Sequence, residues 1–228
     1  MENLKIIYED NHIIVVEKKP NVPSQSDKTE DMDMLSIIKQ YLKEKYNKPG
    51  NVYLGLVHRL DRPVGGVMVF AKTSKAASRL SEQVRNKTFK KEYLAVVDGK
   101  LEQRNGTLEN YLYKDERNNI SKVVNKEKKN AKFAKLDYEV LNYNEVKNLS
   151  LVKINLHTGR HHKIRVQLSN FHHSIFGDQK YGTRGKGKQI ALWAYKLTIN
   201  HPITKEKLVF EDYPESNGTW CILSQINI

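Results

Sequence analysis

The strongest chemical signal in the chain is an aspartate placed between two arginines. Residues 58–66 read HRLDRPVGG, so that Asp61 stands two residues after Arg59 and directly before Arg62. Positive charge on both sides favours a negatively charged carboxylate. An anionic catalyst in a cationic setting suits a polyanionic partner whose sugar or base must be attacked.

The neighbouring sequence predicts how Asp61 is positioned. The apolar run Tyr53–Val57 is typical of a short strand, and the run Val67–Ala71 (VMVFA) predicts another. Between them, Pro63 and the two following glycines favour a sharp turn. We therefore expect Asp61 where a strand gives way to a turn, a geometry that can present a side chain into a cleft.

The charge balance favours a nucleic acid as the partner. Lys and Arg number 39 against 26 Asp and Glu, a formal net charge of +13, and the pI is near 9.6. Such an excess is typical of nucleic-acid-binding proteins, although a lysine-rich proteome gives the same balance. The 228 residues, 39% of them hydrophobic, can form one large domain or two small ones with a real core.

The cysteine and histidine content indicates neither disulfides nor a metal. The one cysteine, Cys221, lies between Trp220 and Ile222 and is expected to be a buried structural thiol. Among eight histidines, His157 and His161 are four apart, but no convergent set of three or four zinc ligands emerges. With a charged N-terminus and no run of about 18 apolar residues, we expect a soluble, cytoplasmic protein that makes no membrane contact.

Periodicity predicts three helices among many strands. Helical patterns cover 34–46, 74–86 with Ser74 as the cap, and 160–169. Expected strands cover Leu4–Tyr8, Ile13–Glu17, Phe89–Val97, Phe133–Tyr143, Leu149–Leu156, Ile190–Ile199 and Lys207–Phe210. The polar stretch 101–130 predicts only short strands and a basic loop. This arrangement favours an α+β fold with a mixed, largely antiparallel β-sheet and flanking helices.

Further blocks follow the Asp61 stretch along the chain. They are Lys91–Val97 (KEYLAVV), Thr158–Arg165 (TGRHHKIR), Gly177–Gly182 (GDQKYG), Leu192–Ala194 (LWA) and His201-Pro202, and the opening IIYEDNHIIVVEKKPNVPS precedes it. Together, and in this order, they resemble the RluA-type family of RNA pseudouridine synthases. Because the similarity spans nearly the whole chain, we expect residues 1–228 to form a single pseudouridine synthase catalytic domain, similar to the family's catalytic domain without the N-terminal S4 domain that many relatives carry.

The resemblance implies an isomerisation that needs no metal or organic cofactor. A uridine loses its N1–C1′ bond, the uracil rotates, and C5 joins C1′. By similarity, Asp61 is the essential aspartate, acting as nucleophile or base toward the ribose. Tyr93 matches the tyrosine that packs on the target base, and Arg165 matches the basic residue that pairs with the aspartate. Arg62 resembles the arginine that fills the space of the flipped-out nucleotide.

The same blocks supply the expected substrate-binding residues. These are His58, Arg59, Arg62, Arg160, His162, Lys163 and Leu168. His58 also has a simpler interpretation, as a hydrogen-bonded histidine that shapes the turn. The chain departs from the family pattern at Val64-Gly65-Gly66, where relatives commonly have Thr-Ser-Gly, and at Lys163, where they often have Gln.

The expected partner is a structured RNA, ribosomal or transfer, and not DNA, bound by a monomer. A base inside an RNA helix must be extruded before it can react, and aromatic and guanidinium planes suit stacking and gap filling. Two alternatives remain open from the residues alone. One is a catalytically silent RNA-binding module, and the other is a hydrolytic glycosidase, which normally needs two carboxylates where the Asp61 stretch has one.

Overall fold

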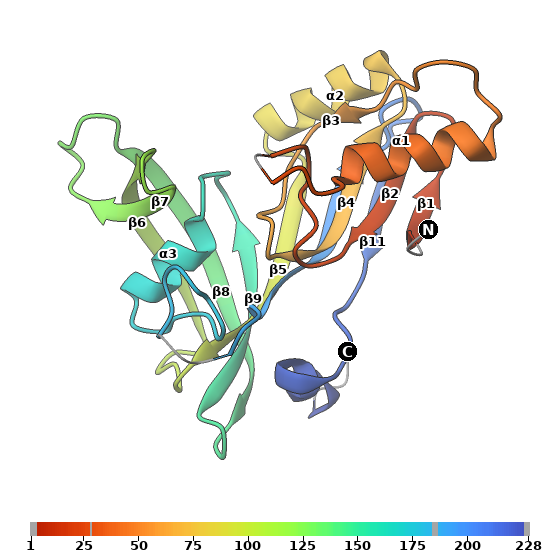
Figure 1. The fold of residues 1–228 in the computed structure, drawn as a ribbon. Coiled ribbons are helices and arrows are strands. Elements are labelled where there is room, and N and C mark those ends of the chain that lie inside the picture. Colours follow the sequence, from red (N-terminus) through yellow and green to blue (C-terminus); the bar gives the residue numbers. More distant parts are fainter. Residues whose placement is uncertain (1–3, 28, 184–186, 226–228) are drawn as a thin grey trace. The chain divides into compact units, whose positions relative to one another are not determined.

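A computed structural model of the protein describes residues 4–27, 29–183 and 187–225 (Figure 1). Its helices are α1 (Met34–Lys45), α2 (Ser74–Arg85), α3 (Lys163–Asn170) and the 3₁₀ helix η1 (Gly218–Gln225). Its strands are β1 (Ile6–Glu9), β2 (Ile13–Lys18), β3 (Gly55–Leu56), β4 (Gly65–Ala71), β5 (Lys90–Asp98), β6 (Asn105–Asp115), β7 (Ile120–Val124), β8 (Lys132–Asn144), β9 (Leu149–Leu156), β10 (Leu192–Asn200) and β11 (Lys207–Glu211). The expected α+β fold with a mostly antiparallel sheet is confirmed.

The chain divides into two compact units, and strands β5 and β10 pass from one to the other. The first unit holds residues 1–91 and 194–213, and the second holds residues 92–193 and 214–228. In the first, the strands follow the order β1-β2-β4-β10, with β3 also paired to β4 and β11 to β10. In the second, the order is β5-β9-β8-β6-β7.

Helix starts follow side-chain capping. The carboxylate of Asp33 accepts hydrogen bonds from the amides of Leu35 and Ser36 and begins α1, as the pattern predicts. At α2 the expected cap, Ser74, is wrong by one residue. Thr73 adopts the extended backbone of a cap, and its hydroxyl accepts from the Ala76 amide, so that Ser74 is the first helical residue.

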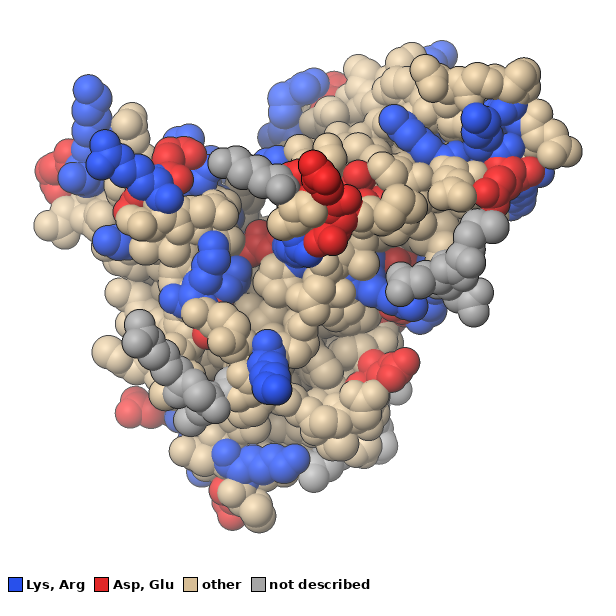
Figure 2. All heavy atoms as spheres, in the orientation of Figure 1, with Lys and Arg blue, Asp and Glu red and all other residues tan. Residues whose placement is uncertain are grey.

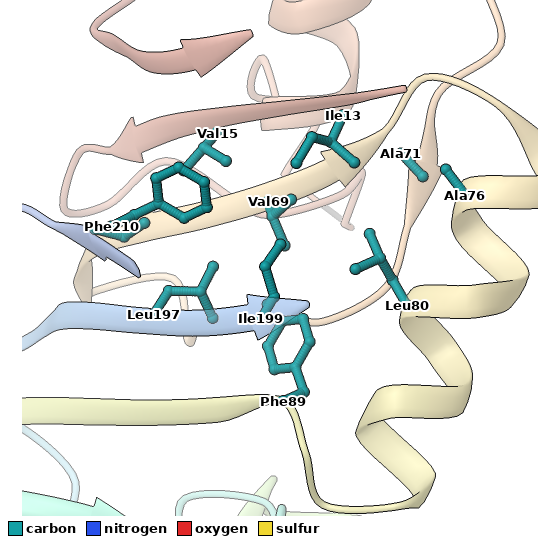
Figure 3. Close-up of a cluster of buried hydrophobic side chains, with 11 residues drawn as sticks. Ile13, Val15, Val69, Ala71, Ala76, Leu80, Phe89, Leu197, Ile199 and Phe210 are labelled. Carbon is teal, nitrogen blue, oxygen red and sulfur yellow. The ribbon is translucent and has the colours of Figure 1, made fainter. Parts of the chain in front are cut away.

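Alternate residues of adjacent strands build the core of the first unit. Ile13 and Val15 of β2 pair in register with Ala71 and Val69 of β4. Figure 3 shows these side chains meeting Ala76 and Leu80 of α2, Leu197 and Ile199 of β10, and Phe89 and Phe210. All are buried, and their packing fixes β4, which leads directly out of the Asp61 turn.

Gly66 is required at the start of β4. Its φ is +127°, and a Cβ there would stand 2.2 Å from the carbonyl oxygen of Ala194 in β10. Only glycine allows both this backbone conformation and so close an approach of the two strands.

The second unit is a long antiparallel meander covered by α3. Residues 101–130, expected to hold only short strands, form the eleven-residue β6 and a hairpin with β7. Helix α3 begins at Lys163 and not at Arg160, because His162 has a left-handed φ of 51°. Val166 of α3 packs on Leu112 and Ala134 of the sheet. Cys221, expected to be buried, is exposed.

None of the helices that the structure describes is long and apolar enough to cross a membrane.

Candidate active site

Asp61 lies on a turn whose backbone is fixed on both sides. The Val64 amide donates to the Asp61 carbonyl over 3.0 Å and closes the turn. Leu60 and Val64 are buried, whereas Asp61 between them is partly exposed. The turn therefore buries the apolar side chains of Leu60 and Val64 and leaves Asp61 partly exposed.

The loop that follows β2 supports this turn through hydrogen bonds. The Ser24 hydroxyl donates to the Leu60 carbonyl over 2.9 Å and accepts from the Leu60 amide over 3.2 Å. The Asn21 amide donates to the Arg62 carbonyl over 2.8 Å. Contacts with the residues before and after Asp61 thus come from a segment about 40 positions away in sequence.

Lys18 connects this loop to the turn. Its side chain is fully buried at the end of β2, and its ammonium donates to the carbonyls of Val22, Arg62 and Lys19 over 2.7, 2.9 and 3.2 Å. Burial lowers the pKa of Lys18 to about 7, while the negative charge of Asp61 acts in the opposite direction. This buried lysine, whose pKa is influenced by the charge of Asp61, is a candidate site residue that the sequence pattern did not predict.

A signal for Lys18 was present in the alternation of β2. Ile14 and Val16 are buried, and Lys18 is the next residue on the same face, whereas the adjacent Lys19 is exposed. Apolar alternation alone does not predict that a lysine occupies such a position.

The two arginines beside Asp61 differ in their surroundings. Arg59 is exposed, and none of the contacts described in this part of the chain involves its side chain. Arg62 forms ion pairs with Asp27, over 3.2 Å, and with Asp31, and donates to the Thr29 hydroxyl over 2.7 Å. Of the two, Arg59 is the one that meets solvent without a described partner.

His58 is a buried structural neighbour of the turn. Its Nε2 accepts the Val69 amide over 3.1 Å, which ties the residue before Arg59 to β4. Its ring packs edge-on against Phe89 with centroids 5.0 Å apart. Burial holds the pKa of His58 well below its usual value, with the charge of Lys91 adding to the effect, so the ring is neutral.

Tyr93 and Arg165 lie in the second unit. Tyr93 is a buried residue of β5, opposite Ile154 of β9. Arg165 of α3 is bound side-on by Asp178, with Nε to Oδ2 at 2.8 Å and Nη2 to Oδ1 at 2.6 Å. Both side chains of this ion pair are buried, with 4% and 0% exposed, and a bidentate pair of this kind fixes the guanidinium plane.

A second layer of contacts surrounds Arg165. Asp178 also accepts the backbone amides of Lys180 and Tyr181, and the Tyr181 ring lies 5.2 Å from the guanidinium carbon. The Tyr181 hydroxyl accepts the Ser121 amide and lies 2.8 Å from Nδ1 of His162. Burial, together with the charge of Arg165, lowers the pKa of His162 to about 2. The Tyr181 ring thus lies between the guanidinium of Arg165 and the neutral ring of His162 in the network of contacts.

The other expected substrate-binding residues have different exposures. Arg160 is exposed, and its Nε donates to the Phe133 carbonyl over 3.1 Å. Lys163 is buried and donates to the carbonyls of Lys135 and Thr158, each over 2.7 Å. Leu168 is fully buried in α3. Arg160 is thus the one of these three with a surface position.

Within the described residues, no three His, Cys, Asp or Glu side chains gather as potential metal ligands. His157, one of the histidines with metal-like spacing, faces Asp137, with Nε2 and Oδ2 2.5 Å apart.

The chain is similar in sequence to RNA pseudouridine synthases. The family model described as RNA pseudouridylate synthase matches residues 12–170. The uncharacterized RNA pseudouridine synthase YhcT of Bacillus subtilis is 33% identical over 210 residues, which cover 91% of this chain and 68% of the relative. The tRNA pseudouridine synthase C of Haemophilus influenzae is 30% identical over 223 residues, which cover 90% of each protein.

Solved structures show the same fold. The human RNA pseudouridylate synthase domain containing 4 superposes with a TM-score of 0.76 at 22% identity, covering 92% of this chain and 89% of that one. The human RNA pseudouridylate synthase domain containing 1 gives the same TM-score at 23% identity. Since the family model matches more than half of its residues, the chain belongs to the RNA pseudouridylate synthase family, whose members isomerise uridine to pseudouridine in RNA.

Proposed function

We propose that this enzyme isomerises uridine in a structured RNA, ribosomal or transfer, with Asp61 as the catalytic carboxylate. The observation that carries the proposal is the Asp61 turn. Asp61 is partly exposed, while the backbone on either side is held by Ser24, Asn21 and Lys18. A carboxylate held in a fixed place requires little reorganisation when charge develops on a substrate.

The reaction balances without any added reactant. As the N1–C1′ bond breaks, positive character develops on the ribose, and the carboxylate of Asp61 either adds to the sugar or removes a proton from it. The released uracil rotates and C5 bonds to C1′, as the bond from Asp61 to the sugar breaks or the proton that Asp61 removed returns to the ribose. C5 then loses its proton and N1 gains one, so that product and substrate have the same composition.

Two residues of the second unit complete the proposed catalytic set. Tyr93 is assigned to pack on the uracil and to take the C5 proton. Arg165 is assigned the role of the basic residue that pairs with the catalytic aspartate in the family, and Asp178 holds its guanidinium in one orientation. We propose that the two compact units act together as one catalytic domain.

RNA binding is assigned to the basic surface. Figure 2 shows several separate groups of Lys and Arg side chains on the face in view, with fewer groups of acidic side chains among them. Arg59, Arg62 and Arg160 are assigned to the RNA, and the buried His58, His162, Lys163 and Leu168 shape the segments that carry them. Backbone phosphates supply most of the affinity and make it salt-dependent.

Transfer RNA is supported as a substrate class by one relative, matched over 90% of both lengths, which is named a tRNA pseudouridine synthase. Ribosomal RNA remains the second class. We propose that the enzyme acts as a monomer, in the cytoplasm where these RNAs are modified, without a metal or organic cofactor.

The test is an Asp61→Asn variant compared with Glu145→Gln, which removes a negative charge from an exposed turn. Pseudouridine formed in total transfer RNA and total ribosomal RNA is measured by chemical mapping, and RNA affinity is measured in parallel. We expect Asp61→Asn to abolish product with affinity retained, and Glu145→Gln to change neither.

Two results would contradict the proposal. Product formed by Asp61→Asn would remove this carboxylate from the chemistry. Release of free uracil by the unaltered enzyme would identify a hydrolase.

A further inference from the structure

Arg62, directly after the proposed catalytic aspartate, is bound by an acidic segment of its own chain. Asp27, Thr29 and Asp31 lie between β2 and α1, and each contributes an oxygen to the guanidinium. We call these three residues the acidic bracket. No sequence pattern connects them with Arg62, which is 31 to 35 positions further along the chain.

The bracket binds the outer edge of the guanidinium. Nη1 of Arg62 donates to Oδ2 of Asp27 over 3.2 Å and to the Thr29 hydroxyl over 2.7 Å, while Nη2 donates to Asp31. The Thr29 hydroxyl in turn lies 2.5 Å from Oδ1 of Asp27, which locks the bracket together. Two carboxylates and one hydroxyl therefore offer oxygens to one guanidinium edge.

A phosphate group offers the same chemistry. Arginine recognises both carboxylates and phosphates through paired N–H donors on one edge, and the two anions compete for those donors. Hydrogen bonds from Thr29 lower the pKa of Asp27, and hydrogen bonds from Arg62 lower the pKa of Asp31, so both are anionic at neutral pH. The bracket thus presents two anionic carboxylates and one hydroxyl to the guanidinium donors that a phosphate would also use.

The bracket is also placed so that it can be displaced. The side chains of Arg62, Asp27 and Asp31 are 36%, 39% and 55% exposed. Exposed ion pairs contribute little to stability because water competes with each partner and side-chain entropy opposes the contact. This distinguishes the bracket from the buried Arg165–Asp178 pair, whose side chains are shielded from solvent.

We propose that the acidic bracket determines specificity by competing with RNA phosphate for Arg62. An RNA must displace Asp27 and Asp31 before it gains this contact. An RNA that touches the surface at random makes few other contacts and does not displace them. An RNA whose uridine is seated near Asp61 brings its backbone against Arg62 and displaces both aspartates. The inference rests on the proposed function in taking RNA as the ligand and in placing its target uridine near Asp61.

The chain offers a matched control within the same segment. Glu30 is an exposed acid between Thr29 and Asp31, and it is not among the described partners of Arg62. Asp31→Asn and Glu30→Gln therefore each remove one negative charge from nearly the same place, and only the first loosens Arg62. The probe is a fluorescein-labelled single-stranded oligouridylate, whose dissociation constant is measured by anisotropy at several salt concentrations.

We expect Asp27→Asn/Asp31→Asn to bind the probe about two- to thirtyfold more tightly than the unaltered protein, the range set by two exposed ion pairs. The gain in affinity for the probe should be larger for Asp31→Asn alone than for Glu30→Gln. The affinity of the double variant should depend more steeply on salt because one more phosphate contact forms. In an Arg62→Gln background the same bracket substitutions should leave the dissociation constant unchanged.

Three results would overturn the inference. They are an equal gain in the Arg62→Gln background, a gain for Glu30→Gln as large as that for Asp31→Asn, and weaker binding by the double variant. The first two would indicate a general charge effect, and the third would mean that the bracket positions Arg62 for RNA. Because the readout is binding, these results are separate from a failure of the proposed function, which would appear as absence of pseudouridine.

Discussion

Replacing Lys18 by methionine is expected to change how the stability of the protein depends on pH. The ammonium is buried beneath the Asp61 turn and contacts three backbone carbonyls. Methionine keeps an unbranched stem of similar size but removes the titrating group. Lys19→Met is the matched control, because Lys19 is the adjacent residue and is exposed.

The magnitude follows from the lowered pKa. Burial reduces the pKa of Lys18 from 10.5 to about 7, so the folded protein releases this proton more readily than the unfolded chain does. Below about pH 7 both states are protonated and the full penalty, about 5 kcal/mol, opposes folding. Above that pH the unfolded chain still binds the proton and the folded protein does not, so stability rises. Between about pH 7 and about pH 9.5 this one group should add about 3 kcal/mol to the free energy of unfolding.

The assay is urea unfolding followed by circular dichroism across this pH range, for the unaltered protein and both variants. The free energy of unfolding of the unaltered protein, minus that of Lys18→Met, should rise by about 3 kcal/mol from the lower to the higher pH. The free energy of unfolding of Lys19→Met should change with pH in parallel with that of the unaltered protein. Parallel curves for Lys18→Met as well would refute the reasoning, because the ammonium would then carry no penalty from burial.

Two further substitutions test the frame of the site. Asp178→Asn should lower the unfolding free energy by about 3–5 kcal/mol, because it leaves the buried guanidinium of Arg165 without its charge partner, and a loss below about 1 kcal/mol in urea unfolding would show that the pair is not buried in solution. Gly66→Ala should lower it by at least about 3 kcal/mol, because the new Cβ meets the Ala194 carbonyl. Gly50→Ala shares the positive φ but has open space around it, so a melting experiment that finds the two equally destabilising would exclude the steric explanation.

Local pattern predicted most elements because their burial is regular. Strand β9 has the expected bounds, Leu149–Leu156, and α1 and α2 end within one residue of the prediction. Strand β6 escaped prediction because its side chains are polar along most of its length. It is held by backbone pairing with β8 from Asn105 to Leu112, which leaves little trace in side-chain periodicity.

The candidate site was predictable at its turn but not in its partners. The Asp61 turn follows from proline and glycine chemistry within a few residues. The contacts of Lys18 with Arg62, of Arg62 with Asp31 and of Arg165 with Asp178 span 44, 31 and 13 positions. With 39 basic and 26 acidic residues, charge complementarity alone allows too many pairings to select these three.

The place of β10 in the first unit has a consequence for synthesis on the ribosome. All seven residues of β4 are buried, and β10 lies beside it, yet β10 is made more than 100 residues later. At translation rates of about 5–20 residues per second, the N-terminal segment waits about 5–20 seconds for that neighbour. The meander from β5 to β9 is complete at residue 156, well before then. The N-terminal segment therefore emerges first but completes its sheet last. Until β10 is made, the edge of β4 is open to pairing with other chains.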